Sequence, residues 1–401
     1  MSRKVLIACV VLAAVSGLGY VVGGVVDKPL LLRFSSKIGM LIGSVGVSLI
    51  WGSRRTLGER RADGFVLNLI VLSVTGILLL GLGEVAMRVL LRDVTTTPDN
   101  SSYFAKRWDR LEVRRNSLGF REREFERVKP PGVFRIAVIG DSFTFGQGVA
   151  EGQRYTNLLE TELNRGPRPL RFEVLNFGRA GAQTIDHIRM LEEAVQAGEP
   201  DFILLEWFVN DPEGKDTSMR PIPTPLFGSS TLQTYLHPAS ALYYVANFAW
   251  RSFQERLGRI ENYQDYMVRR FGDPNQADSR EAARLLREFI ELCRKHGKPL
   301  GIVLFPVIGP ELRTGYKLAF LHERVLADCA RDGIDCVDLR EAFAEFPDAR
   351  TLWVSRFDSH PGPAANRIAA DRLLRRFEPV WAGDARRSSN GTDRVMPVSN
   401  E

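Results

Sequence analysis

A short apolar segment that ends abruptly in Gly140-Asp141-Ser142 constrains the fold of this chain more than any other stretch of its sequence. Residues 134–139 are apolar apart from one arginine, and they are rich in β-branched side chains. Such a run, bounded by turn residues, predicts a strand buried on both faces, as in a parallel sheet. Ligands of open α/β sheets bind beyond the carboxyl ends of such strands, so Ser142 stands where a hydroxyl can do chemistry. Turn geometry alone would also account for a glycine, an aspartate and a serine here.

The downstream sequence alternates between short apolar runs and helical segments, which predicts a parallel sheet with helices on both faces. A last helix begins near Pro363 and carries a stripe of apolar residues at helical spacing. We therefore expect an α/β fold with three layers and a five-stranded parallel sheet. The predicted strands are 134–139, 172–175, 202–207, 300–305 and 334–339, and the predicted helices between them are 155–164, 184–196, 280–295 and 317–330.

The first ninety residues are strongly apolar and predict a transmembrane anchor over residues 1–92. Arginines cluster between the second and third apolar runs, so the positive-inside tendency places that loop and the N-terminus in the cytoplasm. Three crossings then deliver everything after Glu84 to the opposite side of the membrane. A cleaved signal peptide and a second run that does not cross are the alternatives. The three predicted membrane helices lie near 5–26, 36–52 and 65–83.

The rest of the chain divides by composition. Residues 93–131 form a polar, proline-containing linker, and Pro130-Pro131-Gly132 marks the start of a folded domain over 132–380. The interval 212–276 is too long for an ordinary crossover, which predicts an insertion that covers a site, adds a packing helix or lies against the membrane. Residues 381–401 are rich in Ser, Asn, Gly and Arg and predict a disordered tail.

Composition excludes several classes of protein. The net charge of +6 comes from scattered basic residues, and no basic run interleaved with aromatic residues predicts nucleic-acid binding. The four cysteines lack the spacing of metal ligands, and Cys329 and Cys336 form either a disulfide or two buried thiols. The turn at Gly140 has neither a Walker lysine nor the dinucleotide glycine pattern. We therefore expect no metal and no cofactor.

Three further motifs fall at the carboxyl ends of predicted strands or just before the last helix. The second strand runs into a glycine-bearing turn, the third ends in an amide and a carboxylate, and a histidine with a nearby aspartate precedes the final helix. Parallel strands end at one edge of a sheet, so these side chains converge there. The motifs are Asn176-Phe177-Gly178-Arg179-Ala180-Gly181, Asn210-Asp211 and Asp358-Ser359-His360-Pro361.

Elimination among the five histidines favours His360 as a general base. Only His360 has a carboxylate at short range before it and a proline directly after it. His237 lies in the insertion. The other three lie within or at the ends of surface-type helical segments and are expected to be solvated: His187, His296 and His322.

Together, these blocks resemble the SGNH/GDSL hydrolase family. The resemblance covers roughly Asn116 to Phe377 and implies a flavodoxin-like SGNH fold. The stretch 116–121, Asn-Ser-Leu-Gly-Phe-Arg, and an anchor that ends in Glu84 and Arg88 are similar to membrane-anchored bacterial members. One departure is that only Ser359 separates the last aspartate and histidine, where the family usually has two residues. This form is similar to that of some polysaccharide O-acetylation relatives.

The resemblance implies a role for each matched residue. Ser142 would be the nucleophile, His360 its base, and Asp358 the carboxylate that orients the imidazole. The backbone N–H groups of Ser142 and Gly181 and the side-chain amide of Asn210 would form the oxyanion hole, with Gly181 preferred to Gly178 because it stands five residues after Asn176. The supporting carboxylates would be Asp141 and Asp211. The Gly-x-Ser-x-Gly elbow of α/β-hydrolases is absent.

Three functional hypotheses follow. The first is a membrane-anchored serine esterase that removes acyl groups, most of all acetyl, from cell-envelope glycans or lipids. The second is an O-acetyltransferase that uses the same triad to modify an exported polysaccharide. The third is a catalytically silent binding domain. The implied location is the bacterial inner membrane, which the chain would cross several times, with the catalytic domain on the periplasmic side. The partners would be the membrane and the acylated substrate. The sequence does not indicate an oligomeric state.

Overall fold

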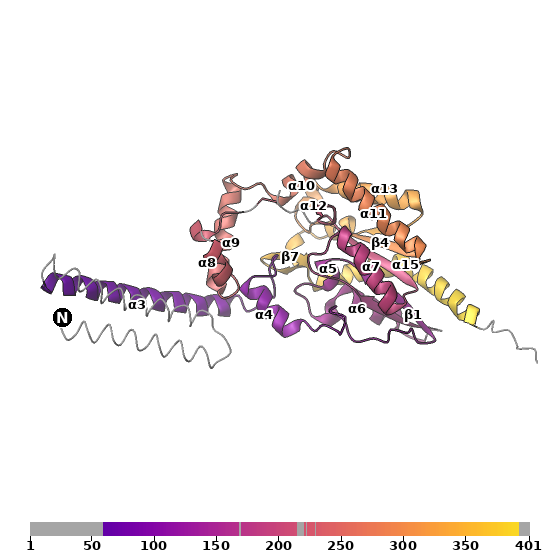
Figure 1. The fold of residues 1–401 in the computed structure, drawn as a ribbon, viewed down its shortest axis with the longest axis horizontal. Helices are drawn as coiled ribbons and strands as arrows, with labels where there is room; N and C mark the ends of the chain where they lie inside the picture. The colour runs from indigo at the N-terminus through magenta and orange to yellow at the C-terminus, as the bar shows by residue number, and fades with distance from the viewer. Residues whose placement is uncertain (1–58, 168–169, 215–219, 222, 229, 393–401) are drawn as a thin grey trace, which may run out of the picture. The chain divides into compact units, whose positions relative to one another are not determined.

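The five predicted strands form one parallel sheet in the order β2-β1-β3-β4-β5. Figure 1 shows the sheet among the helices that surround it. The structure is a computed structural model that describes residues 59–392 apart from 168–169, 215–219, 222 and 229. Each strand agrees with its predicted range to within one residue at either end, so the predicted α/β fold with a five-stranded parallel sheet is confirmed. The strands are β1 (Val133–Ile139), β2 (Arg171–Asn176), β3 (Phe202–Phe208), β4 (Leu300–Phe305) and β5 (Asp335–Asp338).

The order of the strands reverses at β1. The chain passes from β1 to β2 on one side and then crosses to β3 on the other, so β1 pairs with both neighbours. Such a reversal opens a crevice at the carboxyl edge of a parallel sheet. Ser142 follows β1 directly and therefore stands at this switch point.

Helices cover both faces of the sheet. Successive strand side chains alternate between faces, so Ala137 and Ile139 join one buried apolar cluster while Ile136 and Val138 join the other. The first cluster packs under α7 (Thr184–Gly198), α11 (Ala277–Lys295) and α13 (Ala319–Asp332). The second packs under α6 (Tyr155–Leu163), α14 (Arg340–Ala344) and α15 (Pro363–Thr392).

Short helices and strands lie in the connections between the longer elements. A two-stranded antiparallel hairpin precedes α15, and α10 contributes Tyr266, Met267 and Phe271 to the first apolar cluster. The short elements are α4 (Tyr103–Glu112), α5 (Ser142–Phe145), η1 (Glu151–Gln153), η2 (Asp211–Glu213), α10 (Tyr263–Phe271), α12 (Glu311–Thr314), η4 (Ala349–Leu352), β6 (Trp353–Ser355) and β7 (Asp358–Pro361).

The chain forms two compact units. The sheet unit comprises residues 94–100, 105–223 and 254–401, and the helical unit contains α3 together with residues 101–104 and 224–253. In the helical unit the Glu84 carboxylate of α3 accepts hydrogen bonds from the Ser240 hydroxyl at 2.7 Å and from the backbone N–H groups of Ala241 and Leu242. Glu84 thereby caps the N-terminus of α9. The helices of this unit are α3 (Glu59–Leu90), η3 (Leu226–Gly228), α8 (Ser230–Leu236) and α9 (Ala241–Arg256).

One helix within the described residues is long and apolar enough to cross a membrane, over Asn68–Leu90 of α3. It contains most of the predicted run 65–83. The other two predicted membrane helices, near 5–26 and 36–52, lie outside the described residues.

Three segments differ from the sequence-based expectation. Helix α15 continues to Thr392, although we expect a disordered tail from residue 381, because Trp381 is fully buried and packs on Phe202 and Phe377. Most of the expected linker, 93–131, packs into the sheet unit. The expected insertion, 212–276, is split between the two units. Residues 224–253 belong to the helical unit, and α10 packs on the sheet.

Among the cysteines, Cys293, Cys329 and Cys336 are free thiols.

Replacing Gly178 with alanine should destabilise the protein by displacing α5. A Cβ at this position would lie 2.3 Å from the Phe145 backbone nitrogen and 2.7 Å from the Thr144 carbonyl carbon, and backbone atoms cannot rotate away. Overpacking of this kind costs about 1–3 kcal/mol. Thermal unfolding should show a lower Tm for Gly178→Ala. Gly152→Ala is the matched control, because its Cβ would meet nothing within 4 Å; equal Tm values for the two variants would contradict this account.

Candidate active site

The turn after β1 presents Ser142 as the first residue of the four-residue helix α5. The Asp141 carboxylate caps this helix by accepting the Phe143 N–H at 2.8 Å. The helix ends at Gly146, whose φ of 76° lies in the left-handed region that favours glycine. The glycine and aspartate of the motif therefore have structural reasons to flank the helix, and the serine side chain remains available at its start.

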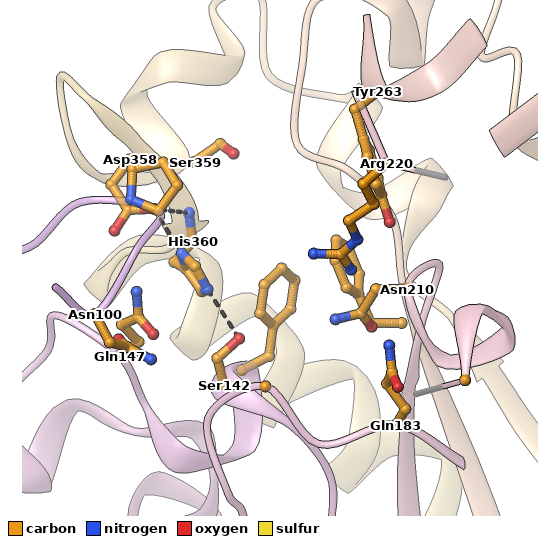
Figure 2. A pocket seen from close by; sticks show the side chains of 15 residues that line it. Asn100, Ser142, Gln147, Gln183, Asn210, Arg220, Tyr263, Asp358, Ser359 and His360 are labelled. Atoms are coloured by element: carbon orange, nitrogen blue, oxygen red, sulfur yellow. Dashed lines mark hydrogen bonds and ion pairs between the residues drawn. The ribbon is translucent and has the colours of Figure 1, made fainter. Parts of the chain in front are cut away.

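The structure brings Ser142, His360 and Asp358 together in one hydrogen-bonded chain (Figure 2). His360 Nε2 lies 2.8 Å from Ser142 Oγ, and His360 Nδ1 lies 2.5 Å from Asp358 Oδ1. The same carboxylate oxygen accepts the His360 backbone N–H at 3.1 Å. Asp358 is fully buried, so it holds the ring through contacts that water does not compete for. This geometry makes the Nδ1–H tautomer the favoured one and leaves Nε2 free to accept the serine proton.

The unusual two-residue spacing of Asp358 and His360 follows from their secondary structure. Both residues lie in β7, which pairs with β6. Residues i and i+2 of a strand point to the same side, so one intervening residue is the spacing that places the two side chains together. The extended backbone thus replaces the longer spacing expected for the family.

The carboxylates around His360 raise its pKa. Burial disfavours the imidazolium, but the charge of Asp358, its hydrogen bond to the ring and the charge of Asp141 outweigh burial. The pKa of His360 is therefore higher than its ordinary value. A histidine with a raised pKa is a stronger base toward the serine hydroxyl, but it is neutral only at higher pH.

A cavity of about 440 Å³ opens over Ser142 and is lined by Gly181, Asn210 and His360 among others. Gly181 has a φ of 78°, and a Cβ there would meet no atom within 4 Å, so its backbone faces open space. The side-chain amide of Asn210 donates to Asp141 Oδ2 at 3.1 Å, and its second N–H is not used by that bond. The three residues expected to supply N–H groups, Ser142, Gly181 and Asn210, thus all line the cavity.

Of the two supporting carboxylates, Asp141 caps α5 and holds Asn210, whereas Asp211 does not line the cavity. Asp211 is fully buried, and its Oδ2 accepts the Phe208 N–H at 3.0 Å. Burial, with repulsion from Asp141, raises the pKa of Asp211 well above its usual range. Asp211 therefore holds the backbone at the end of β3, and its side chain does not face the cavity.

A third buried carboxyl group, Glu206, is missing from the sequence-based site. Glu206 Oε2 accepts the Asp141 N–H at 2.9 Å and the Thr144 hydroxyl at 3.0 Å, directly beneath the nucleophile turn. Burial, with repulsion from Asp141 and Asp211, raises the pKa of Glu206 well above its usual range. The signal in the sequence is a single acidic residue inside the apolar strand 202–208.

Arg121 is a second residue that the sequence-based site lacks. Its buried guanidinium donates to the carbonyl groups of Phe145, Gly146 and Val149 at 3.1, 2.7 and 2.8 Å. Burial, and the nearby charge of Arg154, lower the pKa of Arg121 to about 10. Arg121 closes the motif Asn-Ser-Leu-Gly-Phe-Arg, so that motif fixes the loop which follows the nucleophile helix.

The expectation that His187 and His322 are solvated is wrong, because both are fully buried. They lie on the inner faces of α7 and α13, and His322 Nδ1 is 3.1 Å from Asp338 Oδ1. His296 is partly buried and pairs with Glu192 at 3.0 Å, and His237 belongs to the helical unit. None of these four lines the cavity over Ser142. Within the described residues, no cluster of three or more His, Cys, Asp or Glu side chains could hold a metal ion.

Comparison with known proteins places the geometry in a family. Residues 138–368, more than half of the chain, match the model of the GDSL-like lipase/acylhydrolase family. A search of curated proteins finds no match.

Several solved structures are similar to part of this chain. A lipolytic protein of the G-D-S-L family from Veillonella parvula DSM 2008 is 17% identical, with 61% of this chain and 98% of that chain covered and a TM-score of 0.36. An acetylxylan esterase from Geobacillus stearothermophilus is 21% identical, with 64% and 98% covered and a TM-score of 0.38. The psychrotrophic esterase EstA from a Pseudoalteromonas species is 11% identical, with 61% and 97% covered and a TM-score of 0.36.

Ester hydrolysis should increase with pH through a pKa above about 6.5, the ordinary value for histidine, because only neutral His360 can accept the serine proton. Asp358→Asn removes the charge that raises this pKa, so the imidazole should titrate at lower pH and kcat should fall by about 10⁴-fold as the ring loses its orientation. The pH dependence of kcat/KM for a nitrophenyl ester tests the first expectation, and NMR titration of the His360 ring tests the second. A ring pKa that is unchanged in the variant would remove Asp358 as the cause.

Glu206 should tolerate replacement by glutamine but not by leucine. Its raised pKa favours the neutral carboxyl group, and the oxygen of a glutamine amide can accept the same two hydrogen bonds. Glu206→Leu leaves a buried N–H and a buried hydroxyl without this acceptor, which costs about 1–3 kcal/mol for each group. Denaturant unfolding and kcat should both show Glu206→Gln close to the wild type and Glu206→Leu far below it. Equal losses in both variants would mean that a charged Glu206 is required.

Proposed function

Because this chain belongs to the GDSL-like lipase/acylhydrolase family and is an esterase of that type, we propose that Ser142, His360 and Asp358 hydrolyse acyl esters through an acyl-enzyme. The observation that carries the proposal is the single histidine that contacts both the serine and a buried aspartate, at 2.8 and 2.5 Å. A serine hydroxyl is a weak nucleophile at neutral pH, and a base in direct contact is what activates it.

In the first half of the reaction, Ser142 Oγ forms a bond to the ester carbonyl carbon while His360 Nε2 takes the hydroxyl proton. The carbonyl oxygen becomes an oxyanion. When the intermediate collapses, the bond to the alcohol oxygen breaks and His360 returns its proton to that oxygen, so the alcohol leaves neutral and the acyl group stays on Ser142. Asp358 stabilises the imidazolium in between and is not itself protonated.

In the second half, water takes the place of the alcohol. His360 removes a proton from water, the resulting hydroxide attacks the acyl carbon, and Ser142 leaves with the proton from His360. The oxyanion forms again in this step, and Ser142, Gly181 and Asn210, which line the cavity, would donate their N–H groups to it. Donors that are already in place lower the barrier without reorganisation, and loss of one typically costs about 10²–10³-fold in rate.

We propose acetyl groups on cell-envelope glycans or lipids as the substrates. The cavity over Ser142 holds about 440 Å³, which is room for a small acyl group and part of the alcohol that carries it. Helix α3 supports a membrane location, since residues 68–90 are long and apolar enough to cross. We place the protein in a bacterial inner membrane with three crossings and the catalytic residues on the periplasmic side, because arginines gather at positions 54, 55, 60 and 61 of the sequence.

Transfer to a sugar hydroxyl is the second candidate. Hydrolysis and O-acetyl transfer share the first half-reaction and differ in whether water or a sugar hydroxyl accepts the acyl group. The one-residue separation of Asp358 and His360, which resembles some polysaccharide O-acetylation relatives, favours this alternative. Mass spectrometry of neutral and acidic glycans incubated with an acetyl donor separates the two, because only transfer adds acetyl to the glycan.

Ser142→Ala should abolish hydrolysis of a nitrophenyl acetate and labelling by a fluorophosphonate probe, with a loss in kcat of about 10⁴-fold or more. Ser359→Ala is the matched control, because Ser359 also lines the cavity but stands between the two residues that contact each other. It should keep its activity to within severalfold. A Ser142→Ala enzyme that hydrolyses the ester at the wild-type rate would end the proposal.

Asn210→Ala should lower kcat by about 10²–10³-fold with little change in KM.

A further inference from the structure

A second cavity, of about 400 Å³, lies in the sheet unit beside the first. Its walls come from α4, from the segment that follows it, and from the loops after β1 and β2. Most of these wall residues lie upstream of residue 138, where the match to the family model begins. This cavity is therefore built by a part of the chain that the family's catalytic motifs do not include.

The two cavities are neighbours that share a wall. Asn100 lines both. The loop after β2 contributes Ala180 to the second cavity and the adjacent Gly181 to the first, and α5 contributes Phe145 to the second and Ser142 to the first. The second cavity is therefore close enough to Ser142 to take another part of the molecule whose ester lies at the serine.

The lining of the second cavity is cationic. Lys106, Arg115 and Arg179 line it, against one carboxylate, Asp109. Lys106 is exposed and has no ion pair among the described residues. Arg115 pairs with Asp109 at 3.1 Å, but about half of each side chain is exposed, and such pairs contribute little. An anionic group can therefore compete for these cations at little cost.

The positions of the other cation and of the aromatic wall are fixed. Arg179 is held by Glu193 at 2.6 Å and lies over the ring of Phe120 at 4.4 Å. Trp108 is almost fully buried, with the Arg121 guanidinium 4.8 Å from its ring centroid and Phe145 packed edge-on at 6.2 Å. A preformed wall of this kind loses little entropy when a ligand binds.

We propose that the second cavity is a subsite for an anionic substituent, a carboxylate or a phosphate, on the acylated glycan whose ester is cleaved at Ser142. The inference rests on the proposed function and extends it from the acyl group to the glycan that carries it. Lys106 and Arg115 bind the anion directly, and Arg179, which Glu193 holds in place, forms part of the wall. The enzyme then selects acidic glycans over neutral ones, and does so through affinity more than through kcat.

The test uses the full chain in detergent with Lys106→Gln and Arg115→Gln combined. Arg110→Gln is the matched control, since Arg110 is exposed on the same helix and does not line the cavity. Wild-type kcat/KM should be higher for acetylated oligogalacturonides than for acetylated xylo-oligosaccharides and should fall with added salt. The double variant should lose about tenfold in kcat/KM on the acidic substrate, mainly through KM, as expected for two partly exposed charge contacts. Hydrolysis of nitrophenyl acetate should be unchanged in both variants.

A binding measurement separates this inference from the proposed function. The Ser142→Ala protein is titrated calorimetrically with unacetylated oligogalacturonate, with a phosphorylated oligosaccharide and with neutral xylohexaose. Binding of either acidic ligand that the double variant weakens and Arg110→Gln does not supports the subsite, even if no ester is hydrolysed, and the comparison of the two identifies carboxylate or phosphate. Equal binding of acidic and neutral ligands overturns it. So does a double variant that loses only affinity for vesicles containing phosphatidylglycerol.

Discussion

A helix of four residues cannot satisfy its own backbone, and this constraint governs the site. Helix α5 forms few internal hydrogen bonds, so its terminal N–H and C=O groups need partners from elsewhere in the chain. Glu206 accepts the Asp141 N–H in front of it, Asn176 Nδ2 donates to the Thr144 carbonyl at 2.6 Å, and Arg121 donates to the carbonyl of Phe145 behind it. Each partner is buried, where an unmade hydrogen bond would cost about 1–3 kcal/mol. The position of Ser142 is thus fixed by three side chains from β2, β3 and the segment before β1.

A separate set of contacts, through the hairpin β6–β7, holds His360 against Ser142. Gly362, at the end of the hairpin, donates its N–H to the Leu352 carbonyl at 2.7 Å. Asn366, in the first turns of α15, donates to the carbonyls of Pro361 and Gly362 and accepts the Tyr155 N–H at 2.9 Å. One buried amide therefore joins the end of β7 to the starts of α6 and α15. Because Tyr155 OH also lies 2.7 Å from Thr144 Oγ1, the support of the base and the support of the nucleophile meet on the same face of the sheet.

Much of this arrangement can be predicted from sequence, for a physical reason. Strands buried on both faces are continuous apolar runs, and all five are found to within one residue; Ser142 and His360 follow from turn residues and from the shortage of histidines. Residues that act by burial are not predictable in the same way. Glu206 and Arg121 look like ordinary charged residues until their partners, 65 and 24 positions away, are known. His187 and His322 show the same limit, since helical periodicity does not say which face of a helix a neutral ring will occupy.

The segment before β1 has more influence on the site than a linker would. Gln147 donates to the Thr97 carbonyl at 3.0 Å, and Ser355 donates to the Thr96 carbonyl at 2.9 Å, so residues 94–100 are hydrogen-bonded to the loop after α5 and to the hairpin that carries His360. A Cβ at Gly148 would collide with Thr96 and Val354, which shows how closely the three segments pack. Pro98 and Asn100 then line the cavity over Ser142. A fragment that begins at residue 132 would retain the triad but lose these walls and the guanidinium of Arg121. The triad therefore lies at the ends of the strands and of the hairpin, whereas part of the lining of both cavities comes from residues 94–121, which precede β1 in the sequence.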